Sequence, residues 1–178
     1  MNIIKMCECG KGFVMAPYLT ELTVEQWGPT VWKLLHIIAT RVGKGDAMID
    51  ADAANGLYFT INRLYEVLPC QECQRHARTY IAEHKFNPRG LEGVALRSYV
   101  EQWLLDFHNA VRARKSQPII VGNVEEYEAL WSAQRFLPCD DEALTLYFNY
   151  GKMFKIIDLV KFTSWFNQLK RLRLLLGV

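Results

Sequence analysis

The stretch LPCQECQRHA, Leu68 to Ala77, contains two cysteines separated by two residues. Pro69 restricts the backbone just before them, and residues 71–85 contain no Gly or Pro and so predict a helix. Cys70 therefore falls at or near a helix N-terminus, where free backbone N–H groups and the helix dipole favour a thiolate. Because the thiolate is the nucleophilic form of cysteine, the stretch predicts a redox-active pair, Cys70 and Cys73.

The same cysteine spacing occurs in structural zinc sites, so a second interpretation stays open. His76 follows Cys73 by three residues and shares roughly one helix face with both cysteines. A zinc-binding helical module using Cys70, Cys73 and His76, or the pair Cys7 and Cys9 in place of the histidine, is therefore the alternative. A third reading is a helical interaction protein in which the cysteines are incidental.

The chain has 178 residues, 51% of them hydrophobic, and a net charge of +2. This length fits one domain with an appendage, and the charge gives no case for a nucleic-acid partner. No apolar run approaches the roughly 17–25 residues of a membrane-spanning helix, and no targeting pattern precedes the first helix. We expect a cytoplasmic protein, and five cysteines in that compartment indicate redox chemistry or metal ligation.

Residues 1–22 are predicted to form a flexible arm, because Gly10, Gly12 and Pro17 interrupt regular structure. The arm carries Cys7-Glu8-Cys9. These cysteines are either two ordinary exposed thiols or a mobile dithiol that visits another disulfide. We expect an arm over residues 1–22, a helical domain over 23–138 and a helical extension over 139–178.

Apolar periodicity and the positions of Gly and Pro predict five helices over residues 27–41, 50–68, 71–85, 91–114 and 124–136. Pro29 is expected near the first helical position of the first, and Asp50 or Asp52 should cap the second. Residues 151–178 carry six cations and one anion, +6 − 1 = +5, beside an apolar face at helical spacing. Such a helix packs on its own domain or across a dimer interface, or lies on an anionic membrane surface.

Two places in these helices offer groups for an aromatic ligand. Trp32 and His36 share one face of the first helix, where a histidine is either a core residue or part of a ligand wall. In the fourth helix His108 and Asn109 supply donors and acceptors for a purine edge. The cations that follow suit phosphates, although the helix dipole alone also favours positive charge there; they are Arg112, Arg114 and Lys115.

Taken together, these motifs resemble the FAD-dependent sulfhydryl oxidases of the Erv/ALR family. The resemblance covers residues 27–118 and is carried by four features in the family's order. They are the segment WGPTVWKLLH from Trp27 to His36, the segment LPCQECQRH from Leu68 to His76, Trp103, and the segment HNAV from His108 to Val111. The sequence around Cys70 and Cys73 looks most like that of the branch found in large cytoplasmic DNA viruses.

The resemblance implies an all-α protein: a four-helix bundle holding FAD, with a short fifth helix and the additional helical C-terminal segment. It implies that the Cys70–Cys73 disulfide is catalytic, with Cys73 proximal to the flavin. Cys7 and Cys9 are the only other closely spaced cysteines, and from this position we infer that they are candidates for a shuttle pair. The cofactor-binding residues that it implies are Trp27, Gly28, Trp32, His36, Cys73, His76, Trp103, His108, Asn109, Val111, Arg112 and Lys115.

The chain departs from the family pattern in two respects. Arg112 stands where the family commonly has a second Asn, and Ser116-Gln117-Pro118 stands in place of a Gly-Lys-Pro ending. Arg112, Arg114 or Lys115 is expected to compensate in binding the phosphates. The cysteines that brace the bundle in many cellular members are absent, so packing by the C-terminal segment is expected to replace that disulfide.

The activity implied by the resemblance is disulfide formation in protein substrates, with electrons passing from the thiols through FAD to O₂ to give H₂O₂. The expected partners are thiol-containing proteins or a thioredoxin-like carrier, O₂ as acceptor, and a second copy of the chain in a homodimer. Peripheral membrane contact by the C-terminus is open. The expected compartment is the cytoplasm, that of the host if the chain is viral, with the mitochondrial intermembrane space as the alternative.

Overall fold

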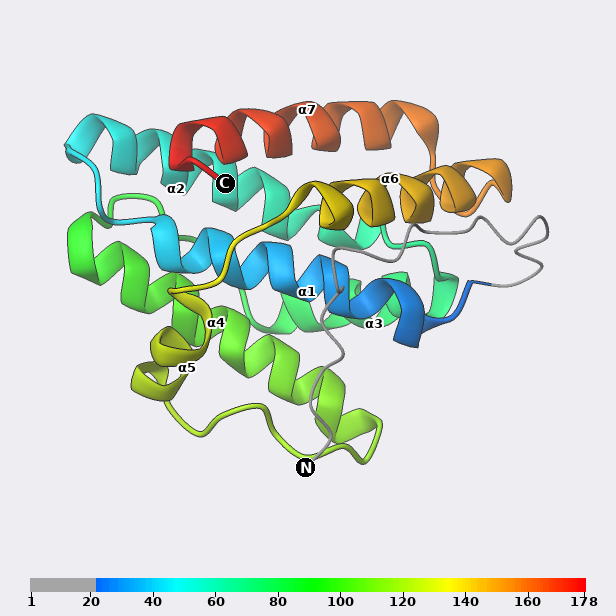
Figure 1. Cartoon of the computed structure of the whole chain (residues 1–178), viewed down its shortest axis with the longest axis horizontal. Helices are drawn as coiled ribbons and strands as arrows, with labels where there is room; N and C mark the ends of the chain where they lie inside the picture. The colour runs from blue at the N-terminus through cyan, green and yellow to red at the C-terminus, as the bar shows by residue number, and fades with distance from the viewer. Residues whose placement is uncertain (1–21) are drawn as a thin grey trace.

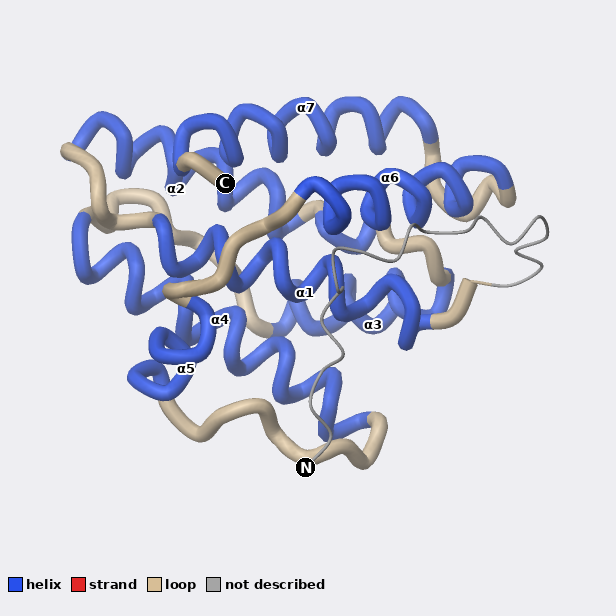
Figure 2. The backbone as a smooth tube through the Cα atoms, in the orientation of Figure 1, coloured by secondary structure: helices blue, strands red, loops and turns tan. Residues whose placement is uncertain are grey.

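The computed structural model describes residues 22–178, and the described part of the chain is built from helices and loops without strands (Figure 2). The predicted arm, with Cys7 and Cys9, lies outside the described residues apart from Leu22. The elements in chain order are α1 (Val24–Arg41), α2 (Ala47–Asn62), a 3₁₀ turn η1 (Leu64–Glu66), α3 (Gln71–Glu83), α4 (Gly93–Arg114), α5 (Val124–Trp131), α6 (Pro138–Met153) and α7 (Leu159–Leu176).

Helix α1 runs through the middle of the molecule (Figure 1). It contacts α4 and α5 on one side and α6 and α7 on the other, while α7 also lies along α2. One continuous cluster of buried side chains joins the elements, with members such as Leu34, Ile38, Leu57, Leu104 and Leu169. The prediction of an all-α protein with a short fifth helix and a helical C-terminal segment is confirmed.

Helix α1 begins earlier than the sequence pattern predicts, and Pro29 is not at its first position. Thr23 and Gln26 form a capping box in which the Thr23 backbone N–H donates to Gln26 Oε1 at 2.8 Å. The helix therefore starts at Val24, and Pro29 lies in its interior. A proline there leaves one backbone carbonyl without its helical partner.

The predicted caps and end of the second helix are wrong. Asp46 caps α2 by accepting a hydrogen bond from the backbone N–H of Ile49 at 2.9 Å, and the helix ends at Asn62 rather than Leu68. Asp50 instead lies inside α2, where its carboxylate accepts a 2.7 Å hydrogen bond from the backbone N–H of Gly93. This contact ties α2 to the start of α4. Helix α5 is also shorter than predicted, ending at Trp131.

The C-terminal segment forms two helices that are fastened to the rest of the domain by buried polar contacts. Lys33 of α1 pairs with Asp140 of α6 at 2.6 Å, and both side chains are largely buried. The indole N–H of Trp165 donates to the backbone carbonyl of Thr60 at 2.8 Å. At Gly56 a Cβ atom would lie 3.2 Å from Leu172, so glycine allows α7 to approach α2 closely.

The buried carboxyl group of Glu101, in the middle of α4, should make the free energy of unfolding depend on pH. The residue is 1% exposed, and its Oε1 atom has no hydrogen-bond partner among the described residues. Burial, followed by repulsion from Glu128, raises the pKa of Glu101 from 4.5 to about 7. Because the folded pKa exceeds the unfolded one, the native state binds the extra proton, and stability is lost as the pH rises through this interval.

We expect the Glu101→Gln variant to be more stable than the unaltered protein at about pH 8, by about 1–3 kcal/mol, since the amide carries no charge. The difference should shrink towards pH 5, where Glu101 is protonated. Urea unfolding at both pH values measures it. An equal difference at both would show that ionisation of Glu101 is not the cause.

Candidate functional site

The disulfide lies at the N-terminal end of α3, as the spacing predicts. Cys70 and Cys73 are joined, with their Cα atoms 5.2 Å apart, and both residues are half-buried. Cys70 is the N-cap residue, and its sulfur accepts a hydrogen bond from the backbone N–H of Cys73 at 3.2 Å. A thiolate at Cys70 would be stabilised by this donor and by the helix dipole.

His76 lies one turn along α3 from the disulfide and interacts with charged neighbours. Arg114 of α4 approaches His76 Nε2 at 2.7 Å, and Glu72 lies 3.7 Å from the same nitrogen. Because a guanidinium can only donate, Nε2 accepts and the ring proton belongs on Nδ1. Desolvation and the charge of Arg114 lower the pKa of His76.

The zinc-module alternative finds no support in this geometry. The sulfurs of Cys70 and Cys73 are bonded to each other, and His76 directs Nε2 to Arg114. Within residues 22–178 no three His, Cys, Asp or Glu side chains are grouped closely enough to hold a metal ion.

The structure brings together Trp32 and His36 of α1 and His108 of α4, which the sequence analysis assigned to two separate parts of the expected cofactor site. The rings of Trp32 and His108 are parallel within 6°, with centroids 3.9 Å apart. His36 lies edge to edge with His108, with the ring planes 13° apart and the centroids 5.0 Å apart. His36 is fully buried, whereas Trp32 and His108 are half-buried. The two helices α1 and α4 thus present a flat aromatic surface that is partly open to solvent.

A hydrogen-bonded chain links this surface to α5. Tyr127 Oη lies 2.6 Å from His36 Nδ1, and His36 Nε2 lies 2.7 Å from His108 Nδ1. Burial lowers the pKa of His36 to about 3, and burial together with His36 and Arg112 lowers that of His108 to about 2. Both imidazoles are therefore neutral, and each ring has one N–H donor and one acceptor nitrogen. Each hydrogen bond contains one proton, so the tautomer of one histidine fixes the tautomer of the other.

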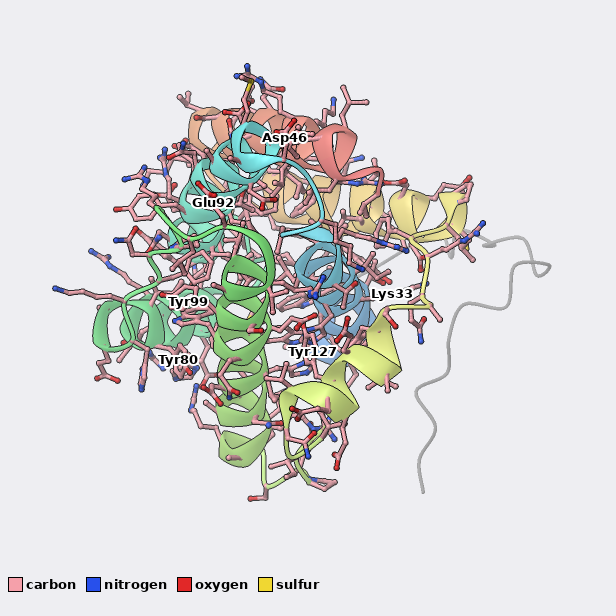
Figure 3. The ribbon with its side chains drawn as sticks, turned by 90° about the vertical axis from the view of Figure 1, so that its left-hand side faces the viewer. Lys33, Asp46, Tyr80, Glu92, Tyr99 and Tyr127 are labelled. Carbon is pink, nitrogen blue, oxygen red and sulfur yellow. A yellow bond between two sulfur atoms is a disulfide. The ribbon has the colours of Figure 1, made fainter. Side chains whose placement is uncertain are left out.

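The position of Tyr127 was missed by sequence reasoning as a site residue, and so was Trp131. Tyr127 lies on α5 and is fully buried (Figure 3). Trp131 stacks on His36 with a centroid separation of 4.6 Å. The four-residue spacing of these two aromatics on a short helix was visible in the sequence. Nothing in it indicated that α5 would pack against His36.

Asn109, Arg112 and Val111 lie at the end of α4, beside the loop that follows. Asn109 accepts from the backbone N–H of Ile120 at 2.9 Å and donates to the carbonyl of Val121 at 3.3 Å. Arg112 donates to the carbonyl of Pro118. In this structure Asn109 and Arg112 hold the loop 116–121 against the helix. Val111 is half-buried.

The start of α1 meets the end of α4. Lys115 pairs with Glu25 at 3.1 Å, and backbone hydrogen bonding and Lys115 lower the pKa of Glu25. Trp27 is 5% exposed, yet its indole N–H has no partner among the described residues. Gly28 is buried, but the only atom near a Cβ built there is in Val24, at 3.6 Å, so the described protein leaves room beside this glycine.

Trp103 is placed away from the aromatic stack. Its ring is 8% exposed, its N–H donates to the carbonyl of His84 at 2.9 Å, and it packs against Phe86. Tyr80 of α3 connects the two regions, since its ring contacts Trp103 and stacks on Phe107, which in turn contacts Trp32. Figure 3 shows Tyr80 on α3 beside α4.

The fold and the site together define a class: a helical protein with a Cys-x-x-Cys disulfide at a helix N-terminus and a neighbouring platform of neutral imidazoles and indoles. The chain belongs to the Erv1/Alr family, whose model matches residues 29–136. Helices α6 and α7 lie beyond the matched part.

Several relatives are named for one activity. The putative FAD-linked sulfhydryl oxidase 347L of Invertebrate iridescent virus 6 is 31% identical over 107 residues, which are 60% of this chain and 94% of the relative. An FAD-linked sulfhydryl oxidase of African swine fever virus is 32% identical over 94 residues, 53% of this chain and 71% of the relative. The rice protein named FAD-linked sulfhydryl oxidase ERV1 is 35% identical over 100 residues, 55% of this chain and 46% of the relative. No solved structure matches the chain.

Proposed function

We propose that this chain is an FAD-linked thiol oxidase that forms disulfide bonds in protein substrates. The observation that carries the proposal is the Cys70–Cys73 disulfide at the N-terminus of α3, in a chain of the Erv1/Alr family. The relatives named above are FAD-linked sulfhydryl oxidases, and most of them come from large DNA viruses.

The residues present fit FAD. The parallel rings of Trp32 and His108 offer a stacking face, and neutral imidazoles can hydrogen-bond a purine without adding charge. Trp27 has an indole N–H still to be satisfied, and the space beside Gly28 would admit a neighbour. His36, His76, Asn109 and Val111 would complete the contacts from α1, α3 and α4, with Arg112, Arg114 and Lys115 as cations for the phosphates.

Thiol–disulfide exchange begins on Cys70, which is the N-cap residue. A substrate thiolate attacks the Cys70 sulfur, a mixed disulfide forms, and Cys73 leaves as a thiolate. The second substrate thiolate then attacks the substrate sulfur of the mixed disulfide, and Cys70 leaves. Its negative charge is held by the Cys73 N–H and the helix dipole. Two substrate thiols have lost two protons and two electrons, and Cys70 and Cys73 have gained the electrons.

FAD, when bound, supplies the two-electron chemistry that returns Cys70 and Cys73 to the disulfide and reduces O₂ to H₂O₂. The protein's part is to place Cys73 and to keep water from the buried side of the site. His36 and Tyr127 line that side and are fully buried.

Further assignments extend the proposal. Cys7 and Cys9 would carry electrons from substrates to Cys70, from an arm over residues 1–22 preceding a domain over 23–138 and an extension over 139–178. A thioredoxin-like carrier and a homodimer are the expected partners, and the viral relatives favour the cytoplasm of a host cell. No helix within residues 22–178 is long and apolar enough to cross a membrane.

The absorption spectrum of the purified protein tests the proposal. We expect a yellow protein that releases one FAD per chain, and we expect dithiothreitol to bleach the flavin and to consume oxygen with formation of H₂O₂. A colourless protein that neither takes up FAD nor oxidises dithiothreitol would contradict it. Stoichiometric zinc in such a preparation would favour the metal-binding module instead.

A further inference from the structure

The turn between α6 and α7 lies at the same end of the molecule as the start of α3 (Figure 1). Gln74, the residue after Cys73, donates through Nε2 to the carbonyl of Leu68 at 2.9 Å and to that of Ile156 in the turn at 3.0 Å. One side chain thus fastens both the segment before the disulfide and the α6–α7 turn. The turn has a fixed position beside the disulfide as a result.

A second contact holds the turn against the segment that precedes Cys70. A Cβ atom on Gly151 would lie 3.3 Å from Pro69 and would collide with Ile157, so only glycine lets α6 end this close. The backbone N–H groups of Ile156 and Ile157 both donate to the Gly151 carbonyl, at 2.8 and 3.0 Å. The turn is therefore a tight, well-bonded structure rather than a loose connection.

The surface of this turn is unusually apolar for an exposed segment. Among the described residues twelve large hydrophobic side chains are exposed, and four of them fall within residues 153–160. They are Met153 at 67% exposure, Phe154 at 47%, Leu159 at 64% and Val160 at 78%. Exposed apolar groups gathered in one place usually mark a binding surface.

The turn also carries positive charge and a strained backbone. Residues 152–161 contain three lysines and one aspartate, +3 − 1 = +2, and one of the lysines, Lys161, pairs with Glu66 at 3.9 Å. Lys155 is exposed and has a φ of 56°, in the left-handed region that favours glycine. Glycine would cost less at this position, so the exposed charge of Lys155 comes with backbone strain.

We propose that the α6–α7 turn, residues 153–160 with Lys152 and Lys161, is a docking surface for the thiol-bearing protein substrate. This inference rests on the proposed oxidase function, because the docked chain must reach the Cys70–Cys73 disulfide. The occupant is a substrate segment that carries apolar and acidic side chains next to its cysteines. Apolar contact with Met153 and Phe154 supplies the affinity, and the lysines select acidic over basic neighbours.

The position of the turn explains why a protein substrate, and not a small dithiol, would use it. The turn lies outside the part of the chain that defines the family, which ends at residue 136. The exchange chemistry needs only the disulfide, whereas a long substrate extends beyond it and meets whatever surface is fixed alongside. Dithiothreitol is too small to contact both.

The test compares two short reduced dithiol peptides, one with Phe and Glu and one with Gly and Lys beside its cysteines, and dithiothreitol. For the unaltered protein we expect kcat/KM to be about tenfold higher with the first peptide, the scale of one well-buried aromatic contact. Met153→Ser/Phe154→Ser should remove this preference and leave dithiothreitol turnover unchanged. Lys155→Gly, which also relieves the strained φ, should reduce the preference and its dependence on salt.

The matched control is Leu174→Ser/Leu175→Ser, which alters two exposed leucines at the other end of α7 and should leave the preference intact. The proposal is overturned if the Met153/Phe154 variant keeps the preference, or if it loses peptide and dithiothreitol turnover equally. It is also overturned if the only property that the variant loses is binding to phosphatidylserine vesicles, measured by sedimentation. The exposed apolar residues would then contact membranes. Lack of dithiothreitol oxidation by the unaltered protein would remove the proposed function itself.

Discussion

The Cys73→Ser variant is expected to lose essentially all thiol oxidase activity while still binding FAD. Without Cys73 no disulfide can form with Cys70, so a substrate thiolate finds no disulfide to attack and exchange does not begin. The flavin should stay yellow when dithiothreitol is added, and oxygen consumption should fall by about 10³-fold or more, as expected when a residue of the reacting pair is removed. Stopped-flow absorbance under anaerobic conditions and an oxygen electrode measure the two quantities.

The Cys7→Ser/Cys9→Ser variant is the comparison that separates chemistry from delivery. It should retain oxidation of dithiothreitol, because Cys70 and Cys73 are untouched. It should lose much of the oxidation of a reduced protein, because the proposed shuttle between that protein and Cys70 is removed. Unchanged turnover of the protein substrate would remove the shuttle assignment. Normal flavin reduction in Cys73→Ser would mean that Cys70 and Cys73 are not the redox pair.

Replacing Tyr127 by phenylalanine is expected to weaken FAD binding by about tenfold, although Tyr127 lies on α5, behind the stacking surface. The phenol occupies one nitrogen of His36, and the other nitrogen of His36 meets His108 at 2.7 Å. Phenylalanine keeps the ring but leaves a buried imidazole nitrogen without a partner, which costs about 1–3 kcal/mol. The order of protons along the chain is then no longer fixed, so His108 presents a mixture of tautomers.

Two measurements test the role of Tyr127. Fluorescence titration of cofactor-free protein gives the FAD dissociation constant, and ¹⁵N NMR of the histidines reports their tautomers without FAD. Tyr99→Phe serves as the control, because the Tyr99 hydroxyl accepts from the Asn87 N–H at 2.9 Å, away from the stack. A single histidine tautomer in Tyr127→Phe, or equal weakening of FAD binding in both variants, would refute the role.

The helical fold was predictable because α3 and α4 are bounded by strong local signals. Pro69 stands before α3, Pro88 and Gly90 stand before α4, and the apolar spacing within each helix is regular. The errors at α1 and α2 also have local causes. The capping box at Thr23 and the cap at Asp46 decide where these helices begin, and competing candidates at Pro29 and Asp50 hid them.

The site was predictable in its cysteines and in the identity of its aromatic residues, but the sequence did not predict how those residues meet. Trp32, His36 and His108 meet because α1 packs against α4, a contact that appears only in the structure. The contact between Tyr127 and His36 depends on how α5 packs on α1, across 91 residues of the chain. The repulsion between Glu101 and Glu128 depends on how α5 packs on α4. Helical periodicity records which face is apolar, but not which neighbour covers it.

The hydrogen bond from Trp165 to Thr60 joins residues that are 105 positions apart in the chain. This separation determines how long after Thr60 its partner is synthesised. During synthesis at about 5–20 residues per second, the ribosome needs about 5–20 s to make the chain between these two partners. Helix α2 is therefore made that long before α7, the helix that covers it. The segment before Cys70 is made almost as long before the α6–α7 turn that contacts it. Helix α7, made after the other helices described here, therefore completes both the core and the surroundings of the disulfide.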